Sequence, residues 1–248
     1  MSFVDVLSTL SDEDIAQTLA NVTDEQVVST LSKSSMDIHD TLVLLSPTAT
    51  PHLETMAQLA HERTVQQFGY TMQLFTPMYI SNYCDNGCVY CGYSHHSSIV
   101  REKLTMDDVE REAQAIAKSG LEQVLVLTGE SKTCSPPSYI QSAVERLVKL
   151  FSRVSIEVYS LTLEEYQSFV QAGADGMTMF QETYNPTLYK KLHPFGPKSD
   201  YTKRIDTPEL ACRAGFRVVN IGALMGLDEW HRDCLLYTSP SPRDTERS

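Results

Sequence analysis

Positive charge is scarce in this chain, and its scarcity narrows the possible partners. The 248 residues include 20 Lys and Arg against 32 Asp and Glu, which gives a formal net charge of −12 at pH 7. The basic residues form no rich patch along the sequence. Proteins that bind nucleic acid or anionic membranes attract these polyanions with clustered Lys and Arg. We therefore expect neither nucleic acid nor a membrane among the partners.

Long apolar runs are also missing. No stretch approaches the roughly 20 residues that span a bilayer. The first ten residues contain Asp5 and lack the positive start of a secretory signal peptide. Three of the six cysteines are clustered, which is not the pattern of a disulfide framework. Together these absences favour a cytoplasmic protein. Its 42% apolar and 21% charged residues are ordinary for a globular chain.

The clustered cysteines are the most informative feature that is present. Cys84, Cys88 and Cys91 have the spacing C-x3-C-x2-C. An apolar run at residues 78–80 leads into them, and the turn-forming residues 85–87 lie between the first two. Three thiolates on one tight loop can hold three irons of a [4Fe–4S] cluster. The fourth iron is then open to a substrate or cofactor.

Other interpretations of the three cysteines stay open at this point. A zinc site usually combines two ligand pairs, and the sequence has no second C-x2-C or H-x3-H pair. An iron–sulfur electron carrier normally closes its cluster with a fourth cysteine, for which Cys134 is the nearest candidate in this region. A loop of buried or reactive cysteines without a metal is the third interpretation, and it explains their close spacing least well.

The hydrophobic pattern changes near residue 75. Residues 1–75 have helical periodicity and helix-capping residues but no motif chemistry. Beyond them, apolar strand-like runs alternate with amphipathic helices, the last expected over residues 208–214. The strand-like runs are residues 78–81, 123–128, 154–159, 176–180 and 217–222. Such alternation predicts parallel βα units, and the lack of a G-x-G-x-x-G motif favours a barrel. We predict an α/β fold: a helical region over residues 1–75, then a partial (β/α) TIM-type barrel of about five strands over residues 76–233.

Polar motifs follow the predicted strands, where barrel enzymes carry their chemistry. Thr128, Gly129 and Glu130 follow the second strand. The glycine allows a close backbone approach to a ligand and the glutamate can accept from an ammonium group, although a plain turn is the alternative. Glu157 is a lone acid in the third strand, so it is expected either on the outer face or directed into the barrel towards a ligand.

Two further candidates lie after the fourth strand. Gln181 begins a polar stretch at residues 181–185, as expected for the rim of a ligand site. Arg204 can pair with a carboxylate of a cofactor or substrate, and a surface salt bridge is the alternative.

The motif C-x3-C-x-Tyr-C after an apolar strand resembles the cluster loop of the radical S-adenosylmethionine enzymes. The resemblance implies that Cys84, Cys88 and Cys91 ligate a [4Fe–4S] cluster and that its open iron binds S-adenosylmethionine. It places Tyr90 near the adenine and identifies no catalytic residue. The other implied cofactor contacts are Thr128, Gly129, Glu130, Glu157, Gln181 and Arg204.

Residues 180–184, Phe-Gln-Glu-Thr-Tyr, narrow the resemblance to two enzymes that cleave L-tyrosine between Cα and Cβ. One is 2-iminoacetate synthase of thiamine thiazole biosynthesis; the other is the tyrosine lyase that matures [FeFe]-hydrogenase. Residues 127–130, 204–208 and 221–227 resemble the first more closely. The resemblance implies a carbon–carbon lyase that forms 2-iminoacetate (dehydroglycine), p-cresol, 5′-deoxyadenosine and methionine. Implied partners are a flavodoxin or ferredoxin reductant and thiazole synthase. The alternatives are the hydrogenase-maturing lyase and a catalytically silent iron–sulfur fragment.

The last residues resemble nothing in this family. Residues 234–244 match one reading frame of a transposon-end sequencing adapter. We therefore expect residues 234–248 to be an artefact without ordered structure, with natural sequence ending near residue 233. A complete (β/α)8 barrel needs about 250 residues, so three strands are expected to be missing. The chain by itself is then expected to be inactive.

Overall fold

The computed structural model describes residues 11–238, which form two compact units. One unit contains residues 11–73 and 225–238, and the other is Leu74–Leu224. Residues 225–233, which the sequence pattern predicts as part of the barrel region, group with the helical unit. In the part of the chain that is described, no helix is both long and apolar enough to cross a membrane.

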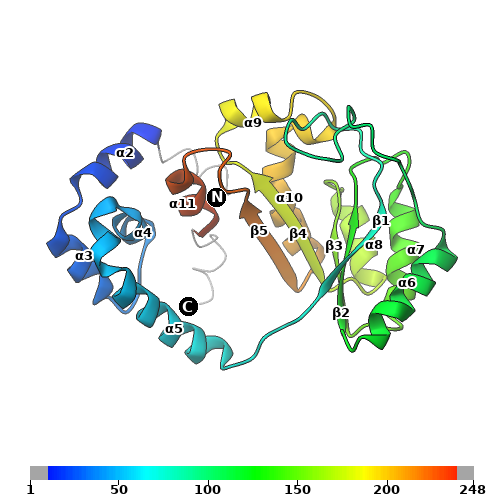
Figure 1. Cartoon of the computed structure of the whole chain (residues 1–248), viewed down its shortest axis with the longest axis horizontal. Helices are drawn as coiled ribbons and strands as arrows, with labels where there is room; N and C mark the ends of the chain where they lie inside the picture. The colour runs from blue at the N-terminus through cyan, green and yellow to red at the C-terminus, as the bar shows by residue number, and fades with distance from the viewer. Residues whose placement is uncertain (1–10, 239–248) are drawn as a thin grey trace. The chain divides into compact units, whose positions relative to one another are not determined.

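A five-stranded parallel sheet forms the second unit (Figure 1). Its strands lie in sequence order, and every neighbouring pair is parallel, as a barrel segment requires. The predicted α/β fold with a parallel sheet is confirmed. The strands are β1 (Thr76–Ser81), β2 (Gln123–Thr128), β3 (Arg153–Glu157), β4 (Gly176–Glu182) and β5 (Val218–Ala223).

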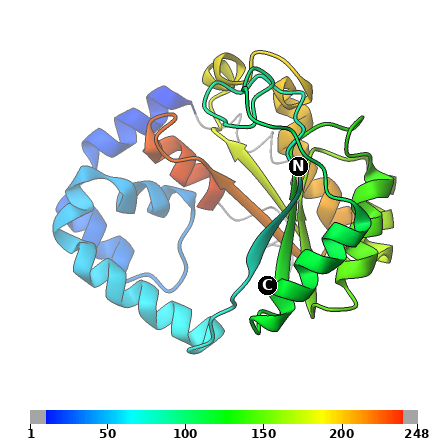
Figure 2. The same cartoon turned by 45° about the vertical axis from the view of Figure 1, so that its right-hand side comes forward.

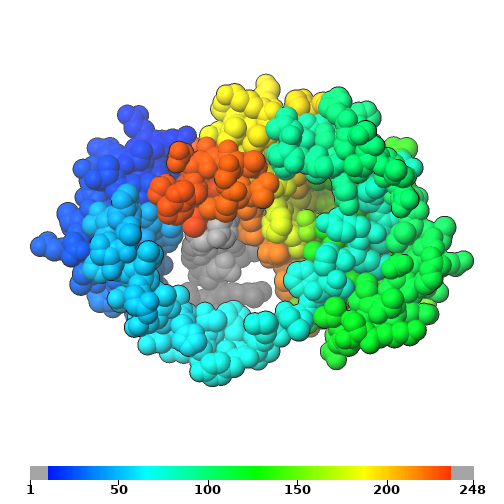
Figure 3. Space-filling model, in the orientation of Figure 1, coloured from blue at the N-terminus to red at the C-terminus, as the bar shows by residue number. Residues whose placement is uncertain are grey.

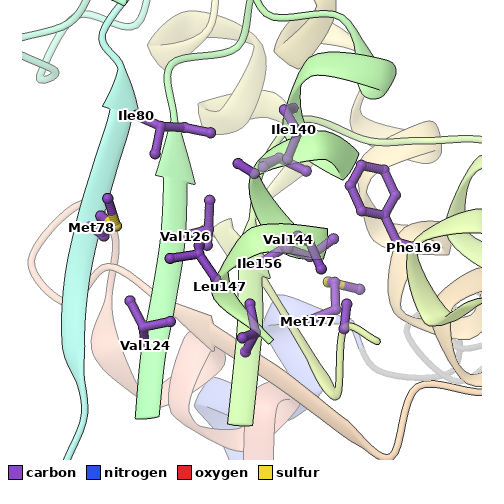
Figure 4. Close-up of a cluster of buried hydrophobic side chains, with 14 of the residues drawn as sticks. Met78, Ile80, Val124, Val126, Ile140, Val144, Leu147, Ile156, Phe169 and Met177 are labelled. Atoms are coloured by element: carbon purple, nitrogen blue, oxygen red, sulfur yellow. The ribbon is translucent and has the colours of Figure 1, made fainter. Parts of the chain in front are cut away.

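Helices between the strands cover one face of this sheet (Figure 2). Successive strand side chains alternate between faces, so Ile80, Val126 and Ile156 point towards the helices. There they pack with helix residues such as Val144 and Phe169 in a closed core (Figure 4). The helices of this unit are α6 (Met106–Lys118), α7 (Pro137–Leu147), α8 (Leu163–Gln171), α9 (Pro186–Leu192), the short η2 (Pro197–Ser199) and α10 (Tyr201–Ala214).

Helix α10 begins earlier than the sequence pattern predicts. We expected a helix over residues 208–214 with Pro208 at its start, but the helix starts at Tyr201 and Pro208 lies inside it. The Asp200 carboxylate accepts a hydrogen bond from the Lys203 backbone N–H and so caps the earlier start. This extra length places Arg204 on a helix above β4 instead of in a loop.

The helical unit consists of helices, three of which have a side-chain N-cap. Side chains of Ser11, Thr23 and Asp37 accept hydrogen bonds from backbone N–H groups in the first turns of three of them. The elements are α2 (Asp12–Asn21), α3 (Asp24–Leu31), α4 (Ile38–Leu45), η1 (Pro47–His52), α5 (Leu53–Phe68) and α11 (Trp230–Thr238).

Helix α11 includes residues that we expected to be without structure. Residues 234–238 complete this helix, and Leu235 is buried with Ile15 and Leu42. Burial of the Leu235 side chain stabilises this helix, because removing apolar surface from water favours the folded state. The remainder of the predicted tail, residues 239–248, lies outside the described residues.

Candidate cofactor site at the strand ends

The three clustered cysteines lie on one loop that leaves the carboxyl end of β1. Cys88 is buried, Cys84 is partly buried and Cys91 is exposed. Burial raises the pKa of the Cys84 thiol, and it raises the pKa of Cys88 to about 11, with Lys198 acting in the opposite direction. These thiols therefore need a metal centre to deprotonate them, and a bound metal does so.

Hydrogen-bond donors already point at two of the sulfurs. The Asn86 side-chain amide lies 3.7 Å from Cys84 Sγ, and the Tyr93 backbone N–H donates to Cys91 Sγ at 3.4 Å. Donors of this kind stabilise thiolate ligands and tune iron–sulfur clusters. Within residues 11–238, no three His, Cys, Asp or Glu side chains converge on a single metal-ion position.

The loop after β2 packs directly on the cysteine loop. The Asp85 backbone N–H donates to Glu130 O at 3.1 Å, and a Cβ on Gly129 would lie 2.3 Å from Tyr83 O. We expected Gly129 to allow a close approach of the backbone to a ligand; in the structure it allows close approach of two protein segments. Any side chain there would separate Glu130 from the cysteines.

Glu130 is the centre of a buried network of charges. Arg204 donates from Nη1 to Glu130 Oε1 at 2.8 Å, and Asn86 donates to Oε2 at 3.0 Å. Lys198 pairs with Glu182 at 2.5 Å, and Arg204 Nη2 lies 3.8 Å from the same carboxylate. Burial opposes the charge on Glu130, but Arg204 and Lys198 outweigh it and hold its pKa below the ordinary value. The network thus combines two acids, Glu130 and Glu182, with two bases, Arg204 and Lys198.

Arg204 is thus not in a surface salt bridge, the alternative that its sequence context left open. Its side chain is 7% exposed, and besides Glu130 it donates from Nε to the Phe180 carbonyl at 2.7 Å. Burial lowers its pKa, but the neighbouring Glu130 outweighs this effect and raises it. The guanidinium therefore stays charged and binds the end of β4 to the loop after β2.

Glu157 lies on the face of the sheet opposite the helices. Its neighbour Ile156 is fully buried in the helix-facing core, so Glu157 points to the inner side. Burial raises its pKa, Glu182 raises it further, and Arg204 opposes the shift. Of the two placements that the sequence left open, the structure has the one that directs Glu157 inward, beside the charge network.

Two polar side chains at the strand ends have no hydrogen-bond partner. Thr128 Oγ1 and both amide atoms of Gln181 are buried and unpartnered among the described residues. Unsatisfied buried polar atoms are costly and rare in folded proteins. They mark positions that a bound polar group or water fills, which fits a cofactor site.

Comparison with known proteins identifies the family of this loop. A family model for the radical SAM superfamily matches residues 78–236, which include most of β1, the cysteine loop and strands β2 to β5. This chain belongs to the radical SAM superfamily. The superfamily uses a [4Fe–4S] cluster and S-adenosylmethionine, and the donor set of this radical SAM chain fits them: three thiols on one loop beside unpartnered polar groups.

Individual relatives of this radical SAM chain include two 2-iminoacetate synthases. The one from Salmonella typhimurium is 36% identical over 236 residues, which are 95% of this chain and 63% of the relative. The one from Escherichia coli is 37% identical over 233 residues, 94% of this chain and 62% of the relative. The chain thus spans less than two thirds of the length of either.

Among solved structures, the crystal structure of HydG, a maturase of the [FeFe]-hydrogenase, superposes with a TM-score of 0.86 at 30% identity. That superposition covers 92% of this chain and 53% of HydG. Methylornithine synthase superposes with a TM-score of 0.67 at 22% identity, which supports the fold alone.

The radical SAM cluster loop is also held from its far side, by residues that sequence reasoning did not select. The Gly87 N–H donates to Phe195 O and the Val89 N–H to Leu192 O, each at 3.1 Å. The segment of α9, yellow in Figure 3, lies against the blue-green cluster loop at the surface. A Cβ on Gly87 would lie 2.1 Å from the Phe195 ring. The two segments can approach this closely only because Gly87 has no side chain.

Tyr90, on the same loop, donates its phenol hydrogen to His193. The distance from Tyr90 Oη to His193 Nε2 is 2.7 Å, and His193 Nδ1 lies 2.8 Å from the Tyr189 carbonyl. A carbonyl only accepts, so Nδ1 carries the hydrogen and Nε2 accepts from Tyr90. Burial lowers the pKa of His193 to about 4, which keeps the imidazole neutral.

Glu182 belongs to the polar stretch expected at the rim of a ligand site, but the sequence did not single it out as a cofactor contact. It has a φ of 73°, the one positive φ among non-glycine residues that the structure describes. A glutamate adopts this backbone at a cost, and such strain is typical of functional positions. The signals available in the sequence were its place after an apolar strand and the Gly-Pro-Lys turn that delivers Lys198.

Proposed function

We propose that the whole protein of which this chain is part cleaves L-tyrosine between Cα and Cβ, forming 2-iminoacetate and p-cresol for thiamine thiazole biosynthesis. The observation that carries the proposal is the similarity to two 2-iminoacetate synthases along 95% and 94% of this chain. The Phe-Gln-Glu-Thr-Tyr sequence at residues 180–184, which resembles that of tyrosine-cleaving enzymes, also supports the proposal. This motif lies at the end of β4, and its Glu182 belongs to the charge network.

The cysteine loop and its neighbours have distinct roles in this proposal. Cys84, Cys88 and Cys91 hold the cluster, and Tyr90, oriented by His193, borders the adenine. Bound cluster and S-adenosylmethionine supply one-electron radical chemistry, with methionine and 5′-deoxyadenosine as by-products. The reductant is a flavodoxin or ferredoxin, and 2-iminoacetate passes to thiazole synthase.

Residues at the strand ends bind S-adenosylmethionine. The loop of Thr128, Gly129 and Glu130 faces its amino group, with Glu130 kept ionised and oriented by Arg204. Thr128 Oγ1 and the Gln181 amide supply the unpartnered hydrogen-bonding atoms. Glu157 supplies an inward carboxylate at the end of β3.

Product analysis tests the proposal. The described strands are continued with the remaining strands of the Escherichia coli relative, the cluster is reconstituted anaerobically, and tyrosine, S-adenosylmethionine and a reductant are added. We expect p-cresol and 5′-deoxyadenosine in equal amounts. Formation of 5′-deoxyadenosine with tyrosine left intact would reject tyrosine cleavage, and neither product with a full cluster would support a silent iron–sulfur fragment.

The similarity to HydG supports a second candidate, a tyrosine lyase of [FeFe]-hydrogenase maturation. Both candidates release p-cresol, so the full-length protein must separate them. A hydrogenase-maturing lyase carries a further C-terminal cluster. About four irons per full-length chain supports the thiamine enzyme, and about eight supports the maturase.

A further inference from the structure

The base of the cluster loop is closed by one guanidinium group. Arg101 donates from Nη1 to the carbonyls of Asn82, at 2.6 Å, and Tyr93, at 3.0 Å. It donates from Nη2 to the Ser94 carbonyl at 2.7 Å. Asn82 precedes the first cysteine and residues 93–94 follow the last, so a single side chain joins both ends of the loop that carries all three thiols.

The backbone of Arg101 is itself held beside the end of β1. Asn82 donates from its side-chain amide to Val100 O at 2.8 Å and accepts from the Glu102 N–H at 2.7 Å. The Asn82 N–H donates to Glu102 O at 3.1 Å. Arg101 therefore reaches the carbonyls from a fixed position, and less conformational entropy is lost when its side chain is ordered.

These contacts are not those of a surface ion pair. The three acceptors are neutral carbonyls, and among residues 11–238 no carboxylate pairs with Arg101. A planar guanidinium can donate to several acceptors in fixed directions, whereas one lysine ammonium cannot match this arrangement. The arrangement therefore depends on arginine geometry as well as on positive charge.

Cys91 is the ligand that most needs this support. The first part of the loop is bound to neighbouring segments through Asp85, Gly87 and Val89. The turn that begins at Cys91 donates its backbone hydrogen bonds within the cluster loop itself: the Ser94 N–H donates to Cys91 O at 3.0 Å, the Tyr93 N–H donates to Cys91 Sγ, and the His95 N–H donates to Asn86 O at 2.7 Å. Its carbonyls at residues 93 and 94 are the ones that Arg101 binds.

We propose that Arg101 is a positioning residue for the cluster: it closes the loop and holds the Cys91 turn ready for iron before any iron is bound. The proposal rests on the cluster assignment made above and adds the residue that organises its third ligand. Asn82 completes the arrangement, because its side chain binds the backbone of residues 100 and 102 on either side of Arg101.

Hydrogen exchange in the iron-free chain tests the preorganisation directly. We expect Arg101→Ala to speed amide exchange in the peptide covering residues 86–97 by about tenfold, because charge-assisted hydrogen bonds are the stronger kind. Arg101→Lys is expected to behave like Arg101→Ala, and added methylguanidinium is expected to restore protection to Arg101→Ala. The matched control is Arg146→Ala, which removes an arginine that binds Glu110 and the Ser142 carbonyl on α7.

Anaerobic reconstitution gives a second readout. We expect Arg101→Ala to bind fewer irons per chain than the wild type and to give an altered electron paramagnetic resonance spectrum after reduction, while Arg146→Ala matches the wild type. Unchanged exchange at residues 86–97 would overturn the proposal, and so would equal acceleration across the whole sheet. If the wild type binds no iron, the cluster assignment fails, whereas a missing p-cresol product with a full cluster rejects only tyrosine cleavage.

Discussion

Replacing Arg204 with methionine tests whether the buried charge network stabilises the strand ends. The substitution keeps most of the side-chain volume and removes the guanidinium. Glu130, whose side chain is 14% exposed, would then keep the Asn86 amide as its direct partner, and the Phe180 carbonyl would lose its donor. The variant therefore contains a buried carboxylate that has lost its direct ion-pair partner, with Lys198 as the remaining nearby base.

The expected cost follows from this burial. Breaking a buried ion pair by removing one partner costs about 3–5 kcal/mol of unfolding free energy. We expect about 3 kcal/mol, the lower end, because Asn86 still donates to Glu130. The matched control is Arg217→Met: its pair with Asp175 is 2.7 Å long, but the Arg217 side chain is 72% exposed. An exposed pair of that kind contributes about 0–1 kcal/mol.

The pH dependence gives a second signature with a defined sign. In the wild type the pKa of Glu130 is depressed, so its stabilisation is present above the unfolded pKa and is lost as pH falls through the folded pKa. In Arg204→Met the burial of Glu130 loses its main opposition, which raises that pKa. The penalty is then largest near neutral pH and shrinks as pH falls and Glu130 takes up a proton.

Urea unfolding followed by far-ultraviolet circular dichroism, at several values from about pH 8 to about pH 5, measures both effects. Hydrogen exchange assigns the loss to β2 and β4. The double variant Glu130→Gln/Arg204→Met is expected to lose less than the sum of the single variants, because it leaves no unpaired charge. The reasoning is refuted if Arg204→Met costs no more than Arg217→Met at neutral pH, or if their difference does not change with pH.

Three further predictions concern the cluster loop. Cys88→Ala is expected to lose the cluster on anaerobic reconstitution, and a full iron content would contradict the ligand assignment. Gly196→Ala is expected to lower the urea midpoint, because Gly196 has φ +94° and an added Cβ would lie 2.5 Å from Asn86 Oδ1. The control is Gly92→Ala, whose added Cβ would have no atom within 4 Å, and equal midpoints for the two variants would contradict the packing. The wild type is expected to lose stability as pH falls from about 6.5 to about 4, because in this range His193 is protonated in the unfolded chain but stays neutral in the folded one. Urea midpoints of His193→Gln should lack this part of the pH dependence, and a profile identical to that of the wild type would count against a neutral buried histidine.

Local patterns in the sequence were sufficient for the fold class and for the cysteine loop. Apolar strands alternating with helices predicted the parallel sheet, because each βα unit is specified by residues close together in the chain. The three cysteines lie within eight residues, so their spacing alone pointed to one loop and one cluster. Residues 234–238 show the converse: we predicted no structure for them, yet they complete a helix in which Leu235 is buried.

Only the tertiary structure decided which charges meet and what holds the loop. Arg204 and Glu130 are 74 positions apart, and their pairing depends on α10 starting at Tyr201 and on the loop after β2 lying against the cysteines. The role of Arg101 leaves no signal in the sequence. Its acceptors are backbone carbonyls, which every residue has, so no particular residue type marks them. Strand order and loop packing select those carbonyls, and no local pattern records that selection.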